Sequence, residues 1–317
     1  MKMNFIEAGY KGKNDWWMYV LGLLIVFFAI QLGSIPLAIV AFVKAEGNIN
    51  AFNEAAKDSF MTMGINSNLW LFLMIFTFMA GLLALFIAVK YLHKKEFSWI
   101  ITSRKKIDWN RIIFGFISWA IVSITLVLIG IYLEPELYVW NFKPIPFFTL
   151  LIISLLFLPF QTSTEELLFR GYFMQGLGLL AKNRWFPLIT TSVIFGLLHM
   201  ANPEIDKIGN LALVFYIGTG LFFGITTLMD QGTELALGLH ASNNIVAAFL
   251  VTTDWTVFRT DALFIDKTEP SVSLLMFLPV FLLYPLMLLL FSKKYNWSDW
   301  KDKLFGNIEK PVLIDES

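Results

Sequence analysis

Long apolar stretches separated by short polar segments dominate the chain. A helix needs about 20 apolar residues to cross a bilayer, because unpaired peptide groups are costly in hydrocarbon. Eight stretches meet or approach this length: 16–43, 69–92, 112–133, one that begins near 147, 185–200, 210–229, 233–251 and 272–291. The pattern predicts an all-α, polytopic membrane protein with about eight transmembrane helices.

The first two stretches and the segment between them support more detailed expectations. Trp16, Trp17 and Tyr19 predict an interfacial aromatic belt, and Pro36 predicts a kink. The first stretch is too long for the apolar region of a signal peptide, so we expect it to remain as an anchor. Apolar residues at helical spacing in 48–68 favour a helix on the membrane surface, and a simple loop fits equally well.

Basic residues are distributed unevenly around these stretches. Lys and Arg accumulate on the cytoplasmic side of a membrane protein. If the N-terminus is inside, sixteen of the 24 basic residues fall in inner segments and six in outer segments. The asymmetry predicts that both termini are cytoplasmic.

Composition narrows the chemistry that is available. The chain is 57% hydrophobic and carries 24 acidic and 24 basic residues, so we expect membrane lipids around it and no nucleic-acid partner. It has no cysteine, which excludes disulfides, thiolate metal sites and a cysteine nucleophile.

Ionisable and amide residues inside apolar stretches are the functional candidates, since a charge at a helix centre costs about 2.5–3.5 kcal/mol on insertion scales. They are Glu165, Glu166, Arg170, His199, His240, Asn243 and Asn244. Glu166 and Arg170 are four residues apart and share a helix face, so they can form an ion pair. Glu165 is rotated about 100° away and is left available. An interfacial salt bridge with a spare carboxylate explains this cluster equally well.

Each histidine has a side chain four residues away on the same helix face. Phe195 precedes His199, and Asn244 follows His240, so His240 and Asn244 can point into one cavity. Taken alone, His199 fits an interfacial or core residue, and the His240–Asn244 pair fits an interhelical hydrogen-bond clamp.

Taken together, these residues form a reaction set. A carboxylate, two imidazoles and an amide can deprotonate water and stabilise an oxyanion, which fits peptide hydrolysis. The same set can be a metal site, with Glu165, His199 and His240 as ligands of a divalent metal such as zinc. No HExxH motif is present, so such ligands would have to come from three helices. The sequence leaves metal dependence open.

The ordered motifs EExxxR, FxxxH and HxxxN, in the region 146–250, resemble those of the CPBP family, also called the Abi or CAAX protease and bacteriocin-processing family. The resemblance implies an eight-helix intramembrane endopeptidase that acts on a membrane-associated protein or peptide. By this likeness, Glu165 would activate water with His199, and His240 with Asn244 would position the water or form the oxyanion hole. The implied catalytic set is Glu165, Glu166, His199, His240 and Asn244, with Arg170 and Phe195 in supporting roles.

The resemblance also implies an organisation and a location. It divides the chain into an N-terminal transmembrane region with a basic cytoplasmic loop (1–145), a catalytic core (146–250), and a last helix with its tail (251–317). The expected location is the bacterial plasma membrane, with several membrane passes. We expect the tail 292–317 to be amphipathic and to face the membrane, and His93 to lie at the cytoplasmic interface.

Two other functional classes remain as alternatives. A noncatalytic membrane scaffold or a bacteriocin-immunity-type protein of the same fold would use the polar residues only to hold helices together. A transporter is the weaker alternative, because no pair of short interrupted helices occurs in corresponding halves. The small-residue spacing of Gly220 and Gly224 instead predicts close helix packing.

The depths of the candidate residues conflict in the simplest topology. Glu165 falls toward the inner end of the fourth stretch, and His199 toward the outer end of the fifth. Either the fourth and fifth spans are broken or tilted, or a boundary is misplaced. We expect the fourth span to end earlier, with Glu165 well within the bilayer, because the segment 167–180 is still apolar enough to continue it. His199 must then also lie deeper than its position in the pattern indicates.

Overall fold

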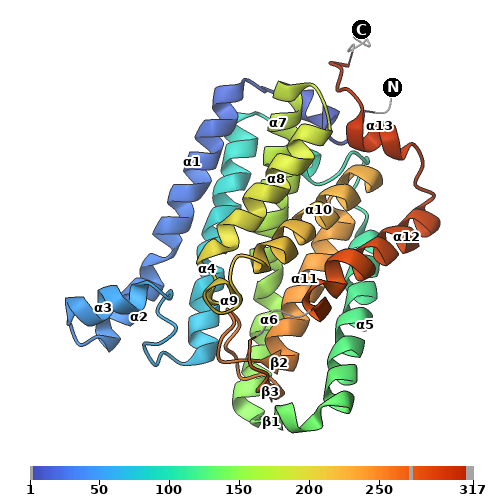
Figure 1. Cartoon of the computed structure of the whole chain (residues 1–317). Helices are drawn as coiled ribbons and strands as arrows, with labels where there is room; N and C mark the ends of the chain where they lie inside the picture. The colour runs from blue at the N-terminus through green and yellow to red at the C-terminus, as the bar shows by residue number, and fades with distance from the viewer. Residues whose placement is uncertain (1–2, 271–273, 312–317) are drawn as a thin grey trace.

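A computed structural model describes residues 3–270 and 274–311. Most of the helices run along one direction and form a bundle, as Figure 1 shows. The expected class, an all-α polytopic membrane protein, is confirmed. Large apolar side chains on the outward faces of α1, α5 and α6 are exposed, as a lipid environment requires.

The α-helices are α1 (Trp16–Gly33), α2 (Ile35–Lys44), α3 (Ile49–Ala56), α4 (Ser67–Ile87), α5 (Trp109–Leu133), α6 (Pro144–Glu166), α7 (Met174–Ala181), α8 (Trp185–Leu197), α9 (Pro203–Ile208), α10 (Ala212–Asp230), α11 (Glu234–Leu250), α12 (Tyr284–Tyr295) and α13 (Trp300–Phe305). π-helical segments cover Ala88–Leu92, Leu167–Phe173 and Pro279–Leu283. Turns of 3₁₀-helix cover Glu7–Tyr10, Phe97–Ile100, Pro135–Leu137, Leu198–Ala201 and Leu274–Phe277.

Five helical stretches within the described residues are long and apolar enough to cross a membrane. They are Trp16–Lys44, Ser67–Leu92, Trp109–Leu133, Pro144–Ala181 and Ala212–Asp230. The other three expected spans are also helical, but they are shorter: Trp185–Ala201, α11, and the π segment with α12. The expected start of the last span, at residue 272, lies outside the described residues.

The first span and the segment after it agree with the sequence pattern. The helix is interrupted at Ser34, and Pro36 is the second residue of α2, where a missing backbone N–H costs little. The segment that follows combines the two expected forms, because α3 is a short helix and turns continue the chain to α4.

The candidate glutamates lie inside the longest helical stretch. The segment Pro144–Ala181 is continuous through α6, the π segment and α7, and its 38 residues give a length of about 57 Å. Glu165 is near its midpoint, so the helix continues through the apolar segment 167–180, and the expected earlier end of the fourth span is wrong. The π segment starts directly after Glu166, and such irregularities are frequent at functional sites.

Small residues bring the helices around the candidate site into close contact. A Cβ atom added at Gly220 of α10 would lie 2.8 Å from the Ser192 carbonyl oxygen of α8, and one added at Gly224 would meet the Leu188 side chain. The close packing predicted from Gly220 and Gly224 is therefore confirmed. Gly238 of α11 likewise sits against the backbone of α5.

A small sheet at one end of the bundle was not predicted. It has the order β1-β3-β2, with β1 (Tyr138–Trp140) antiparallel and β2 (Val251–Thr252) parallel to β3 (Phe264–Asp266). Figure 1 shows it at the end opposite the first and last described segments. The strands join the connection between α5 and α6 to the segment that follows α11.

Two expectations about the periphery are wrong. His93 is fully buried, with Nδ1 2.8 Å from the Lys13 carbonyl oxygen and Nε2 2.7 Å from the Tyr172 hydroxyl. The described part of the C-terminal tail packs on the protein: Trp297 is buried and its Nε1 donates to Asp230, 3.1 Å away. His93 and Trp297 are thus used in the interior of the protein instead of at the membrane surface.

Candidate active site

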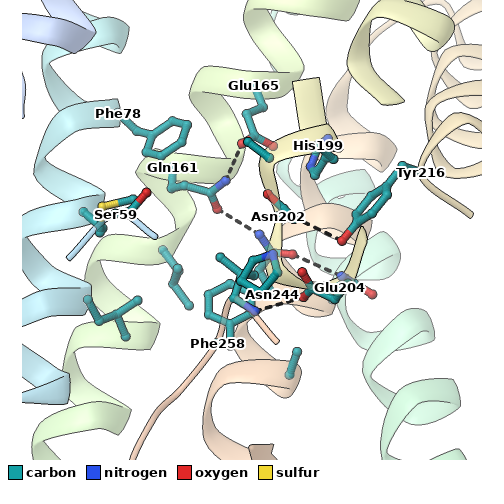
Figure 2. A pocket seen from close by; sticks show the side chains of 18 of the residues that line it. Ser59, Phe78, Gln161, Glu165, His199, Asn202, Glu204, Tyr216, Asn244 and Phe258 are labelled. Carbon is teal, nitrogen blue, oxygen red and sulfur yellow. Dashed lines mark hydrogen bonds between the residues drawn. The ribbon is translucent and has the colours of Figure 1, made fainter. Parts of the chain in front are cut away.

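A cavity of about 360 Å³ lies between the helices and contains most of the motif residues. One wall is apolar and comes from α4, with Trp70, Leu71, Met74, Ile75 and Phe78. The opposite side is polar and includes Gln161, Glu165, His199, Asn202, Glu204, His240, Asn243 and Asn244, several of which Figure 2 labels. The cavity therefore offers apolar contact on one side and hydrogen-bonding groups on the other.

Glu166 and Arg170 form the expected ion pair. Arg170 Nη1 donates to Glu166 Oε1 at 2.9 Å, and both side chains are fully buried. Arg170 Nη2 donates to the Gly220 carbonyl oxygen at 3.1 Å, and the guanidinium lies 4.3 Å from the centre of the Phe195 ring. Glu166 is not among the residues that line the cavity. The pair thus connects the long helix to α8 and α10 from behind the cavity wall.

Glu165 has the opposite surroundings, although it is the next residue along the chain. Its side chain lines the cavity and is 16% exposed. Gln161 Nε2 donates to Glu165 Oε1 at 2.7 Å, and Glu165 Oε2 lies 3.5 Å from His240 Nε2. The rotation of about 100° between successive helix positions places one carboxylate in the protein interior and the other in the cavity.

His240 lies between the two glutamates. Its Nδ1 is 2.8 Å from Glu166 Oε1, and the ring stacks on Phe223 with centroids 5.1 Å apart. An ionised carboxylate only accepts hydrogen bonds, so Nδ1 carries the ring proton when His240 is neutral. The unprotonated Nε2 then faces Glu165.

His199 reaches the same cavity from the 3₁₀ turn that ends α8. Its Nδ1 donates to the Phe195 carbonyl oxygen at 2.7 Å, which leaves Nε2 unprotonated in the neutral ring. The ring stacks on Tyr216, with centroids 4.3 Å apart and an interplanar angle of 22°. Asn202 donates to the Tyr216 hydroxyl at 3.2 Å, as Figure 2 shows. The expected Phe195–His199 proximity is therefore present, with a centroid distance of 4.8 Å.

Asn244 lies beside His240 on the cavity wall, but the structure gives it other partners. Its Nδ2 donates to Gln161 Oε1 at 2.9 Å, and its Oδ1 accepts from Asn243 Nδ2 at 3.1 Å. The amide thus links α11 to α6. The sequence analysis missed Gln161, although it precedes Glu165 by four residues and so shares its helix face.

Glu204 is a second cavity carboxylate that the sequence analysis missed. It lies in α9, outside the expected spans, and its Oε1 accepts from the Val257 backbone N–H at 2.9 Å. Burial raises the pKa of the Glu204 carboxyl above its usual value. A carboxylate in a polar loop is common on protein surfaces, so its residue type alone gave no signal.

The residues that were considered as metal ligands do not form a compact ligand set. Across residues 3–270 and 274–311, no group of three or more His, Asp or Glu side chains is arranged to hold a metal ion. Nδ1 of His240 and Nδ1 of His199 have protein partners, so only Nε2 of each ring is open to a further ligand. Glu165, His199 and His240 are therefore not arranged as the three ligands of one ion.

Fold and site together define a helical, polytopic membrane protein whose motif residues from three helices meet at one cavity. Residues 144–246 match the family model described as type II CAAX prenyl endopeptidase Rce1-like. The chain belongs to this family, which confirms the resemblance to the CPBP or CAAX proteases and indicates a CAAX-protease-like enzyme.

One relative extends the similarity beyond that region. The chain is 31% identical over 261 residues to "Uncharacterized protein YyaK" of Bacillus subtilis (strain 168), an alignment that covers 81% of this chain and 85% of that protein. No solved structure matches the chain.

Proposed function

We propose that this protein is an intramembrane endopeptidase that hydrolyses a peptide bond of a membrane-associated protein or peptide. The observation that carries the proposal is the placement of Glu165. It is the member of the glutamate pair that lines the cavity, and it lies 3.5 Å from the nearest ring nitrogen of His240. A carboxylate beside an imidazole in a polar cavity can deprotonate a water molecule for attack on a carbonyl.

The remaining residues have complementary roles in the proposed reaction. Glu165 takes a proton from water as the oxygen attacks the peptide carbonyl, and the proton then passes to the leaving nitrogen. On its way from Glu165 to the leaving nitrogen, the proton can be held at His240 Nε2, because Glu166 at Nδ1 stabilises the imidazolium. Glu166 and Arg170 are positioning residues in this scheme, since both are buried behind the cavity wall.

The oxyanion also has a candidate donor. Asn244 Nδ2 carries two hydrogens and gives one to Gln161, so the second is available at the cavity surface. A fixed donor aimed at developing negative charge can contribute about 10²–10³-fold to the rate. His199 lies on the same polar side and supplies a second unprotonated imidazole nitrogen to orient the water.

The two walls of the cavity suit an amphipathic substrate segment. The apolar side chains of α4 can pack against apolar residues of a membrane-associated peptide, and the polar side can bind its backbone. Such a division between apolar lining and a few convergent polar groups is typical of ligand sites.

The test is cleavage of a membrane-tethered peptide library by the purified protein, read by mass spectrometry. We expect the wild type to cleave, and Glu165→Gln to be slower by about 10²–10⁴-fold, because the amide cannot act as a base. Glu54→Gln is the matched control, since Glu54 is 75% exposed and lies outside the cavity, and it should cleave at the wild-type rate. A strong chelator should leave the wild-type rate unchanged.

Other outcomes replace parts of the proposal. Loss of cleavage on chelation would replace the glutamate-activated water with a metal-dependent mechanism. Equal cleavage by wild type and Glu165→Gln would overturn the role of Glu165. Binding of peptides without any cleavage would favour the noncatalytic scaffold or immunity-type alternative.

A further inference from the structure

A chain of four side-chain hydrogen bonds begins in the protein core and ends at Glu165. Trp119 Nε1 donates to Asn243 Oδ1 at 3.1 Å, and Asn243 Nδ2 donates to Asn244 Oδ1 at 3.1 Å. Asn244 Nδ2 then donates to Gln161 Oε1 at 2.9 Å, and Gln161 Nε2 donates to Glu165 Oε1 at 2.7 Å. We call Trp119, Asn243, Asn244 and Gln161 the amide relay; it connects α5, α11 and α6.

The chemistry of the two ends gives the relay one direction. An indole N–H only donates and an ionised carboxylate only accepts, whereas each amide can donate and accept. With these ends fixed, only one orientation of the three amides satisfies all four bonds. Turning over any one amide would place oxygen against oxygen or nitrogen against nitrogen at both of its contacts.

The fixed end of the relay lies away from the cavity. Trp119 is only 6% exposed, and its ring packs against Phe222 and Tyr284 with centroids 6.2 Å and 5.6 Å away. Trp119 is not a cavity-lining residue, so it cannot touch a substrate bound there. Aromatic packing holds the indole, and the indole sets the orientation of the amides.

We infer that the amide relay is a positioning device for the catalytic carboxylate, an inference that rests on the proposed role of Glu165. The N–H of Gln161 holds Glu165 Oε1, which leaves Oε2 directed toward His240 and available to a water molecule. Trp119, Asn243 and Gln161 are thus positioning residues. Asn244 has a second task, because fixing its Nδ2 on Gln161 also fixes the direction of its remaining hydrogen.

A purely structural clamp between the three helices is the competing explanation. Both explanations predict a loss of stability when a bond is removed. Only positioning predicts that kcat falls while the KM of Trp119→Phe stays constant, and that variants at the two ends of the relay are not independent in their effects on kcat.

The experiment compares Trp119→Phe, Gln161→Met and the double variant with wild type. Phe keeps the aromatic packing and removes only the N–H, and Met keeps the length of Gln without its hydrogen bonds. From the strength of single hydrogen bonds, we expect kcat to fall about 3- to 10-fold for Trp119→Phe and about 10- to 100-fold for Gln161→Met. KM should stay unchanged for Trp119→Phe, because Trp119 does not line the cavity, and the double variant should match the kcat of Gln161→Met alone because the relay is already interrupted.

A matched control separates loss of the relay from loss of any buried indole bond. Trp297→Phe removes the N–H that donates to Asp230; neither residue belongs to the amide relay or lines the cavity, so this variant should keep wild-type kcat. Wild-type kcat in Trp119→Phe, or effects on kcat that multiply in the double variant, would overturn the inference and favour the clamp.

A second measurement on the same proteins does not depend on turnover. The shifts in apparent Tm of the two single variants should not add in the double variant, because the relay couples residues that share no direct bond. Additive shifts would overturn the inference even if the wild type cleaved no peptide. Absence of Glu165-dependent cleavage together with non-additive shifts would reject the proposed function and retain the coupled relay.

Discussion

The fully buried Glu166–Arg170 pair allows stability and catalysis to be separated at single residues. Removing one member leaves an uncompensated buried charge, which typically costs 3–5 kcal/mol, whereas replacing both with apolar residues is often neutral. We expect Arg170→Met to lower the apparent Tm strongly, and Arg170→Met combined with Glu166→Leu to recover most of the loss. Thermal unfolding in detergent measures both.

The double variant should remain inactive although it is stable. His240 would lose the carboxylate that holds its Nδ1, 2.8 Å away in the wild type, and so could not act as a stabilised imidazolium. A double variant no more stable than Arg170→Met would contradict the assignment of the pair as the charge balance of this region.

His93 makes stability depend on pH. Burial lowers its pKa from 6.5 to about 4, so the folded protein keeps the ring neutral where the unfolded chain is protonated. Stability should therefore fall as the pH drops from 6.5 to 4, by an amount on the order of 3 kcal/mol. The free energy of unfolding should depend less on pH over this range in His93→Gln, whose side chain can still bond to Lys13 and Tyr172.

Lys95 provides a contrast within the same cluster. Burial lowers its pKa from 10.5 to about 7. Stability should therefore also fall as the pH drops, in this case between pH 10.5 and pH 7. The His93→Gln variant should keep this second dependence. If the free energy of unfolding of the wild type did not change between pH 6.5 and 4, the His93 ring would be solvated in the folded protein.

Local helix geometry decides which residue-level features could be predicted from sequence. The Glu166–Arg170 pair follows from a spacing of four residues, as does the separation of Glu165 from that pair. The partners of Asn244 and the burial of His93 depend on which helices pack together. Because those contacts join distant segments, no local pattern in the sequence indicated them.

At the scale of elements, the approach of α10 to α8 determines where Arg170 finds its backbone acceptor. A Cβ at Gly220 would lie 2.8 Å from the Ser192 carbonyl oxygen and 2.9 Å from its Cα, and the Gly220 carbonyl accepts from Arg170. Gly220→Ala should push the helices apart, at a cost of about 1–3 kcal/mol. We expect a lower apparent Tm and reduced cleavage.

A control in the same helix tests whether added volume alone is responsible. Val214 is 37% exposed, so Val214→Leu adds a carbon at a partly solvent-accessible position and should behave like wild type. If Gly220→Ala were as stable and active as Val214→Leu, α10 would be free to shift and would not fix Arg170.

Helices and strands could be predicted where the sequence pattern that identifies them extends over many residues, and not where it covers only a few. Runs of apolar residues identified the helices, since a span needs many such residues. The three strands have two or three residues each, and β1 pairs with β3 across more than a hundred positions, so no periodic pattern could reveal them. The length of the fourth helix followed only once the apolar residues after Arg170 were counted with it.

At the scale of the whole molecule, the first and last segments meet at the end opposite the sheet. Arg184 Nη2 lies 3.1 Å from Glu7 Oε1, and the Ile308 backbone N–H donates to the Lys182 carbonyl oxygen at 3.0 Å. Figure 1 shows both segments at this end. An even number of membrane passes, as the eight apolar stretches predict, would bring them to the same side.

The lining of the cavity indicates the side from which a substrate enters. It runs from the middle of the long helix to residues of three connections, represented by Ser59, Glu204 and Val257. The charge-based topology places all three connections outside. Combined with the structure, it predicts a cavity that opens away from the cytoplasm and receives its substrate from the outer face.

The absence of cysteine makes this prediction directly measurable by labelling with a membrane-impermeant maleimide. In intact cells, Ser59→Cys at the cavity and the exposed Glu136→Cys after α5 should be labelled. Lys301→Cys in α13 should react only after permeabilisation, because basic segments stay in the cytoplasm. The opposite pattern would reverse the topology and open the cavity to the cytoplasm. Labelling of Ser59→Cys without Glu136→Cys would mean that one predicted span does not cross, since both connections should lie on one side.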